Sequence, residues 1–166
     1  MATSAHQLCI EAVQTDVQAL VTATTISGLG ITTANVFKRK LPTDRNLTYT
    51  AAIPALIVVS YPVGAAITLH PSLSTNQSEA VGYPVQVTGF YAADQNLEID
   101  SSSDTFALWA EKIFRHYHGK NPLTSVSGLF ECRVEPGTVI DAEAHQTRNI
   151  MAWAHVVRCI GRFARV

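Results

Sequence analysis

Two histidines separated by one residue, His116 and His118, are the most obvious metal-ligand candidates in this sequence of 166 residues. On a strand such a pair would point to one side. The surrounding pattern instead indicates the end of a helix, where side chains two positions apart diverge. No cysteine or carboxylate stands at the spacing expected of further zinc ligands. We therefore interpret the pair as a solvated helix end and expect no metal.

Two glycine-containing stretches resemble phosphate-binding motifs only in part. Residues 28–30 (GLG) lack the third glycine of a dinucleotide-binding turn, and they follow a predicted helix instead of a strand. In residues 119–121 (GKN), the Gly-Lys pair is followed by Asn and not by Ser or Thr. The sequence therefore predicts neither a nucleotide nor any other cofactor.

Residues that could act as nucleophiles have no recognisable activating context. Ser60 and Ser127 lack the G-x-S-x-G elbow that exposes a catalytic serine. His155 is the one histidine set among apolar neighbours, and we interpret it as a core or interface residue more readily than as a general base. We expect no enzymatic activity.

The three cysteines, Cys9, Cys132 and Cys159, are odd in number and widely spaced. This pattern fits neither a disulfide framework nor a zinc site, so we expect free, small, buried hydrophobic residues in a reducing compartment. The first twelve residues lack a secretion signal. The longest apolar run, around residues 53–59, is too short to span a bilayer, so no membrane partner is expected.

The charge pattern is the remaining pointer to a partner. The chain is 47% hydrophobic and 15% charged, with a formal net charge of −1, which excludes a strong overall attraction to nucleic acid. Two local basic clusters are either ordinary solvated charge or contacts with neighbouring subunits or DNA. The candidate oligomer or lumen residues are Lys38, Arg39, Lys40 and Arg45 in the first cluster, and Arg158, Arg162, Phe163 and Arg165 in the second.

The elements that position these residues follow from hydrophobic spacing. Ser4 and Gln7 form a capping-box pattern that predicts a helix over residues 5–25, with Gly28 as a stop. A second helix begins within residues 101–104, carries a wide apolar stripe and ends at Gly119.

Several segments show the composition of strands. Residues 55–60 are predicted to form a central strand covered on both faces, whereas the last strand is predicted to lack a partner. In residues 126–134 we expect Phe130, Cys132 and Val134 to point inward, and Gly89 should mark a bulge or a close neighbour. The predicted strands are 35–41, 55–60, a short edge piece within 64–69, 83–91, 126–134 and 150–163. Residues 70–80 are a predicted loop, and 141–148 a polar connection with a helical turn.

The whole chain, residues 1–166, is therefore predicted to be one α+β domain. We expect a single mixed or antiparallel sheet of four to five strands, with two main helices packed on one side.

An ordered set of short segments within residues 30–163 resembles phage-derived and prophage-like bacterial proteins of this length. These in turn look like the tail-terminator and tail-completion proteins of long-tailed bacteriophages. The segments are residues 36–42 (VFKRKLP), 54–59 (PALIVV), 75–76 with 82–87 (TN and GYPVQV), 109–113 (WAEKI) and 130–137 (FECRVEPG).

The resemblance implies an α+β virion protein that forms a homo-oligomeric, hexameric ring at the neck, after assembly in the host cytoplasm. Such a ring caps the tail tube, contacts the head-tail connector or adaptor protein, and passes packaged DNA without reading it. It implies no catalytic residue and no cofactor. Another neck component, a head-completion or adaptor protein, is the nearest alternative. A small ligand-binding or enzymatic domain with a pocket around His155 or His116 is the alternative from a different class.

Overall fold

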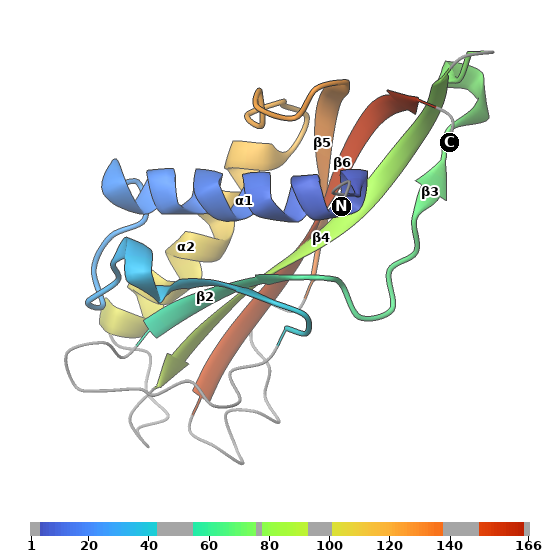
Figure 1. Ribbon diagram of the computed structural model, residues 1–166. Helices are drawn as coiled ribbons and strands as arrows, with labels where there is room; N and C mark the ends of the chain where they lie inside the picture. The colour runs from blue at the N-terminus through green and yellow to red at the C-terminus, as the bar shows by residue number, and fades with distance from the viewer. Residues whose placement is uncertain (1–3, 43–54, 76–77, 93–100, 138–149, 165–166) are drawn as a thin grey trace.

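Figure 1 shows the computed structural model of the protein, which describes residues 4–42, 55–75, 78–92, 101–137 and 150–164. Two helices and six strands confirm the predicted α+β class. Short 3₁₀ helices at Thr33–Asn35 and Pro71–Leu73 complete the described elements. In chain order, the main elements are α1 (Ala5–Thr22), β1 (Val36–Arg39), β2 (Ala55–Ser60), β3 (Thr68–Leu69), β4 (Ser78–Ala92), α2 (Ser101–Tyr117), β5 (Leu129–Pro136) and β6 (Ile150–Ala164).

The strands form one mixed sheet in the order β1-β2-β4-β6-β5, and β3 pairs with β4. β1 and β2 are parallel, and all other pairs are antiparallel. This order contains five strands, which is the upper limit of the prediction. The two-residue β3, which pairs only with β4, is a sixth strand. β4 and β6 pair along all 15 residues of each strand, which makes them the backbone of the sheet.

The last strand, β6, lies inside the sheet, between β4 and β5. The expectation that it lacks a partner was therefore wrong. The reason is that β5 folds back onto the side of β6 that β4 leaves free, a long-range pairing that hydrophobic spacing does not reveal. The outermost strands of the path are β1 and β5.

Both helices cover one face of the sheet, as predicted. Ala55, Ile57 and Val59 of β2 belong to the main core cluster together with residues of α1 and α2. The alternate residues Leu56 and Val58 point to the opposite face, where they join a smaller cluster. All six residues of β2 are buried, which confirms the prediction of a strand covered on both sides.

The helix ends agree with the predicted caps, with two differences. Ser4 Oγ accepts the Gln7 N–H at 3.2 Å, but the Gln7 side chain donates to Glu11 instead of completing the capping box. α1 ends at Thr22, three residues earlier than predicted, and Thr24 just beyond it has a φ of 57°. Gly119, with a φ of 68°, follows the end of α2 as expected.

Phe130 points outward and is 42% exposed, so its predicted inward position was wrong. Leu129 pairs with Gly161 and Glu131 pairs with Ile160. Phe130 is the extra residue of the bulge between these pairs, so its side chain does not follow the inward–outward alternation of the strand. Cys132 and Val134 are buried as predicted. β4 starts at Ser78, so the end of the predicted loop 70–80 is strand, whereas residues 141–148 lie outside the described ranges.

Candidate functional site: an exposed apolar segment beside a basic groove

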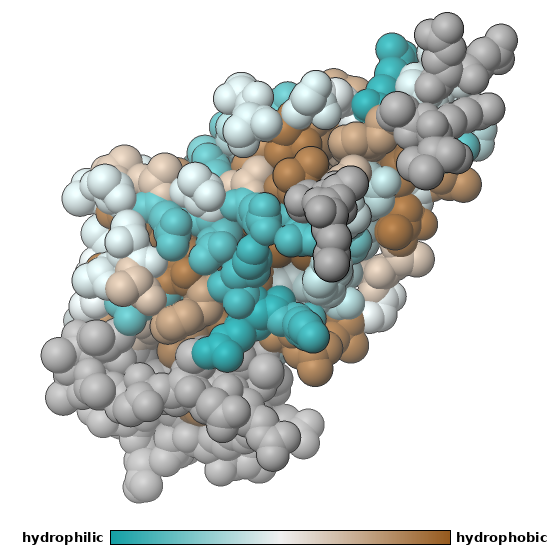
Figure 2. Space-filling view, in the orientation of Figure 1, coloured by the Kyte–Doolittle hydropathy of each residue, from teal (hydrophilic) through white to brown (hydrophobic). Residues whose placement is uncertain are grey.

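Large apolar side chains are exposed along one segment, residues 61–73, which links β2 to β4. Val63 and Leu69 are 67% and 66% exposed, and Ile67 is 52% exposed. Tyr61 and Leu73 are also exposed, so this short segment holds five of the nine exposed large apolar residues in the described part of the chain. Brown, apolar side chains stand at the margin of the molecule in Figure 2, where Figure 1 places β3. Concentrated exposure of this kind is typical of a protein-binding surface. We call residues 61–73 the apolar segment.

The apolar segment is tied to the sheet through its backbone, so its exposed side chains belong to an ordered structure. Val63 N donates to Gln86 Oε1 at 3.1 Å, and His70 N donates to Ala80 O at 2.8 Å. β3, within the segment, pairs with Gly82 and Val81 of β4. Because the backbone polar groups are bonded inward, the apolar side chains are left outward.

Arg158, a predicted interface residue, is one of the anchors of this segment. Its guanidinium Nη1 donates to Ala66 O at 2.8 Å and to Thr68 Oγ1 at 3.3 Å. Its Nε donates to Glu135 Oε1 at 2.8 Å, and the side chain is only 12% exposed. Arg158 therefore makes its ionic contacts within its own chain.

Gly82 leaves room for the Arg158 side chain to cross β4. A Cβ atom at Gly82 would lie 2.5 Å from Thr68 Oγ1 and 3.1 Å from both Cγ and Cδ of Arg158. Any larger residue at this position would push the arginine stem or the threonine away. The glycine is thus needed for close approach and not for a turn.

The rest of the C-terminal cluster also makes contacts within the chain. Arg162 is exposed, and its Nε donates to Leu73 O at 2.9 Å, at the far end of the apolar segment. Phe163 packs edge-on against Tyr83, with ring centroids 5.2 Å apart. Arg165 lies outside the described residues. The described part of the cluster therefore holds the apolar segment and the end of β6 in place.

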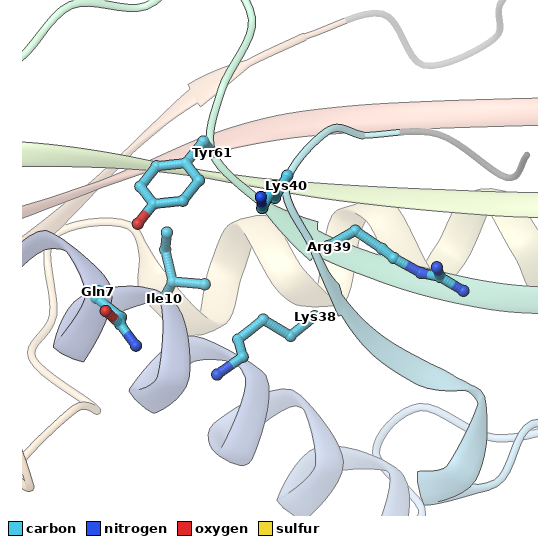
Figure 3. Close-up of a pocket in the computed structure, with 6 residues that line it drawn as sticks. All are labelled: Gln7, Ile10, Lys38, Arg39, Lys40 and Tyr61. Atoms are coloured by element: carbon cyan, nitrogen blue, oxygen red, sulfur yellow. The ribbon is translucent and has the colours of Figure 1, made fainter.

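The first basic cluster lines a groove between α1 and β1. The groove has a volume of about 300 Å³. Figure 3 shows the side chains of Tyr61 and Ile10 close together on one side of it. Since Tyr61 is the first residue of the apolar segment, the groove and the segment form one continuous surface. The lining residues are Gln7, Ile10, Lys38, Arg39, Lys40 and Tyr61.

The three cations of this groove are not equivalent. Lys38 Nζ lies 2.7 Å from Glu11 Oε1, and this hydrogen bond lowers the pKa of the Glu11 carboxyl. Arg39 stands over the Phe37 ring, 5.7 Å from its centroid, and in Figure 3 its side chain points away from Tyr61. Within the described residues neither Arg39 nor Lys40 pairs with a carboxylate, and Arg45 lies outside them. The groove is therefore mainly apolar and carries a net positive charge.

An aromatic row that sequence reasoning missed connects the two clusters. His6 lies 4.9 Å from the Tyr61 ring and 5.3 Å from the Tyr83 ring, and Tyr83 in turn contacts Phe163. His6 Nε2 donates to Pro84 O at 2.7 Å, which fixes the imidazole between the two tyrosines. These residues come from distant parts of the chain, so no local pattern points to them. The apolar segment itself was visible in the sequence as a run of apolar residues within 61–73. The sequence patterns predict only an edge strand and a loop there, and no binding surface.

The histidines considered for catalysis or metal binding have structural partners. His116 Nε2 lies 2.7 Å from Asp16 Oδ2 on α1. His118 Nδ1 accepts the Val134 N–H at 3.4 Å, so the two imidazoles bind different elements. Among the residues that the structure describes, no three His, Cys, Asp or Glu side chains are grouped to hold a metal ion.

His155 is a core residue, which is the interpretation that its apolar neighbours favoured. It is 4% exposed, and its Nε2 donates to Ala110 O of α2 at 3.0 Å. Burial lowers the pKa of the imidazole, more strongly than this hydrogen bond raises it. Nδ1 is buried without a partner in the described structure.

No helix in the described ranges is long and apolar enough to cross a membrane. Comparison with protein-family models, with curated proteins and with solved structures finds no match for the chain. The surface formed by the apolar segment and the basic groove is therefore the main structural basis for a functional proposal.

Proposed function

We propose that the protein is a virion structural subunit, a tail terminator that forms a homo-oligomeric ring. The ring caps the tail tube of a long-tailed bacteriophage and joins it to the head-tail connector. The observation that carries the assembly role is the ordered, exposed apolar segment 61–73. Its side chains are held outward by a backbone that is bonded to the sheet, and another subunit is the partner that removes them from water.

The free energy available from covering this segment is of the right size for association. Covering the exposed part of a half-buried Val, Ile or Leu contributes about 1–2 kcal/mol. The four Val, Ile and Leu side chains of the segment together contribute about 4–8 kcal/mol, which reaches or exceeds the lower estimates, about 4 kcal/mol, of the rigid-body entropy lost on association. A ring also repeats the contact at every subunit, because each subunit uses two different surfaces, one for each neighbour.

The place of the ring in the virion rests on the segment order within residues 30–163. The single α+β domain agrees with the subunit that this resemblance implies. Of the predicted basic residues, Lys38, Arg39, Lys40 and Arg162 are exposed, and we propose them as the described residues that face a neighbour or the DNA in the lumen. With a net charge of −1, such a lumen lets DNA pass without holding it tightly.

The proposal is tested first by the oligomeric state of the full-length protein. Native mass spectrometry and negative-stain electron microscopy are expected to show hexameric rings. Ile67→Asp is expected to weaken association at least about tenfold, because it places a charge in a covered apolar contact. Leu108→Asp is the matched control, since Leu108 is 44% exposed on α2, outside the apolar segment, and Ile67 is 52% exposed. A wild-type protein that stays monomeric at high concentration, or equal effects of both substitutions, contradicts the proposal.

The second test asks what the assembled protein binds. Purified tail tubes of a long-tailed phage, mixed with the protein, are expected to be capped at one end and to stop elongating. Binding to isolated connectors without binding to tubes would identify the alternative, a head-completion or adaptor protein. Binding to neither would contradict any role at the neck.

A further inference from the structure

The three cysteines, far apart in the sequence, meet in the core. Cys9 lies on α1, Cys132 on β5 and Cys159 on β6, and each is a free thiol with 0% exposure. The interactions of the Cys159 thiol with Cys132 and Cys9, together with its burial, raise the pKa of Cys159 well above its ordinary value. The predicted burial of all three cysteines is confirmed. Their meeting was not predicted, because it depends on strand pairing and helix packing.

The register of the sheet places Cys132 and Cys159 directly opposite each other on adjacent antiparallel strands. Cys132 N donates to Lys120 O at 2.6 Å, and Cys132 O accepts from Gly119 N at 2.9 Å. Both backbone groups of Cys132 therefore point away from β6. The two cysteines form a non-hydrogen-bonded pair, in which the Cα atoms are roughly 4.5 Å apart and the side chains are closest.

This pair has the geometry that a disulfide needs. Disulfides join Cα atoms that are about 4.4–6.8 Å apart, with both Cβ atoms on the same side of the sheet. The register fixes both conditions for Cys132 and Cys159. Cys9 approaches from a helix, and no backbone ladder sets its distance from Cys159.

We infer that Cys132 and Cys159 form a covalent modification site, at which a low-molecular-weight disulfide introduces a reversible cross-strand disulfide. This inference is independent of the ring and of the neck, since it rests on the interior of a single subunit. It adds a chemistry that the association surface does not contain.

The exchange proceeds in two balanced steps. The Cys132 thiolate attacks one sulfur of the reagent disulfide, and a first reagent thiol leaves. The Cys159 sulfur then attacks the mixed disulfide at the Cys132 sulfur, and a second reagent thiol leaves. Two protein S–H bonds and one reagent S–S bond are lost, while one protein S–S bond and two reagent S–H bonds form.

Cys132 is the first thiol to react because β5 is an outermost strand of the sheet, beside the turn at residues 119–120. Local opening of this strand exposes Cys132 before Cys159, which lies on an interior strand. In the second step the departing reagent thiolate takes up the proton of the Cys159 thiol.

The disulfide would tie an outermost strand to the centre of the sheet and close a loop from residue 132 to residue 159. Such a constraint reduces the conformational freedom of the unfolded chain. We expect the oxidised protein to unfold at a temperature roughly 5–10 °C higher than the reduced protein.

The test uses oxidised glutathione as the probe and the full-length protein in its folded state. After incubation the protein is denatured and its free thiols are alkylated, and the intact mass is expected to show one alkyl group, on Cys9, whereas the reduced control carries one on each of its three cysteines. Trypsin is expected to release residues 121–133 and residues 159–162 as one linked peptide under non-reducing conditions. Dithiothreitol should separate the two.

Three serine variants assign the bond. Cys9→Ser is expected to keep the same linked peptide, whereas Cys132→Ser and Cys159→Ser should abolish it. Glutathione adducts without an internal disulfide, or a Cys9–Cys159 link in the wild type, would overturn the inference. The inference would also be overturned if the folded wild type formed no disulfide under conditions that oxidise the urea-unfolded chain. The wild-type peptide map decides even if a serine variant does not fold.

Discussion

The imidazole of His155 is held in the core as a neutral group. Its Nε2–H donates to Ala110 O, and the rings of Trp153 and Phe114 lie within 5.6 and 6.3 Å of its own. Burial disfavours the protonated form and lowers the pKa of His155 below 6.5, the usual value. The residue thus links the stability of the fold to pH.

The sign of this linkage follows from the two states. The unfolded chain binds a proton at His155 at a higher pH than the folded chain does, so acidification favours unfolding. The stabilising contribution is complete above about pH 6.5 and is lost as the pH falls through the lowered pKa, by at most about 1.4 kcal/mol per pH unit. Urea unfolding between about pH 5 and about pH 8 should show this loss for the wild type. In His155→Gln, which keeps a donor but does not titrate, the profile should be flatter, and equal slopes would contradict the assignment.

Gly89 shows a second residue-scale constraint, imposed by an indole ring. Gly89 pairs with Trp153, and a Cβ atom at position 89 would lie only 2.3 Å from Trp153 Cε2. The pairing of β4 with β6 continues through this position without a bulge. Of the two roles predicted for this glycine, the close neighbour is confirmed.

At the scale of elements, the apolar segment depends on one charged side chain, Arg158, which is only 12% exposed. Arg158 binds Ala66 O, Thr68 Oγ1 and Glu135, and so connects β3 and the segment before it to β5 and β6. The segment has little regular pairing of its own beyond β3. Its order therefore relies on side-chain contacts with the long strands.

Arg158→Met is expected to loosen the apolar segment without unfolding the sheet. Methionine keeps much of the apolar stem but removes the donor to Ala66 O, which we expect to cost about 0.5–1.5 kcal/mol because Ala66 is exposed and water can bind its carbonyl instead. Hydrogen exchange should accelerate in residues 66–70 and remain unchanged in β2. Arg115→Met is the control, since Arg115 pairs with Glu111 on an exposed helix surface and should leave both quantities unchanged. Equal exchange in both variants would remove Arg158 as the anchor.

At the scale of the whole molecule, an exposed apolar surface occurs in a chain that is only 15% charged. Such a surface is more stable when a second molecule covers it than when its apolar side chains stay in water. Because association stabilises only the folded state, it also makes the unfolding temperature depend on protein concentration.

The unfolding temperature of the wild type is accordingly expected to rise when its concentration is raised by about two orders of magnitude. The unfolding temperature of Ile67→Asp should stay nearly constant with concentration, and that of Leu108→Asp should rise as the wild-type value does. Differential scanning calorimetry at several concentrations measures all three. A wild-type value that does not change with concentration would mean that the apolar segment stays uncovered in solution.

Local patterns along the chain were enough to predict both helices, their caps at Ser4 and Gly119, and the strands of the sheet path. The reason is that apolar periodicity, capping residues and β-branched runs act within a few residues of each other. The same patterns predicted that His155 and the three cysteines would be buried, since burial follows from apolar neighbours in one element. They also indicated the two basic clusters as candidate interface residues, but they did not indicate which groups each cation binds.

Long-range pairing settled the rest. The position of β6 between β4 and β5, the meeting of Cys132 with Cys159, and the turn of Arg158 toward Ala66 all depend on contacts between residues distant in the sequence. A single bulge turned Phe130 outward, because one extra residue reverses the side to which a strand residue points. The exposed apolar segment arises in the same way, since only the folded sheet decides which apolar side chains of residues 61–73 are buried and which stay exposed.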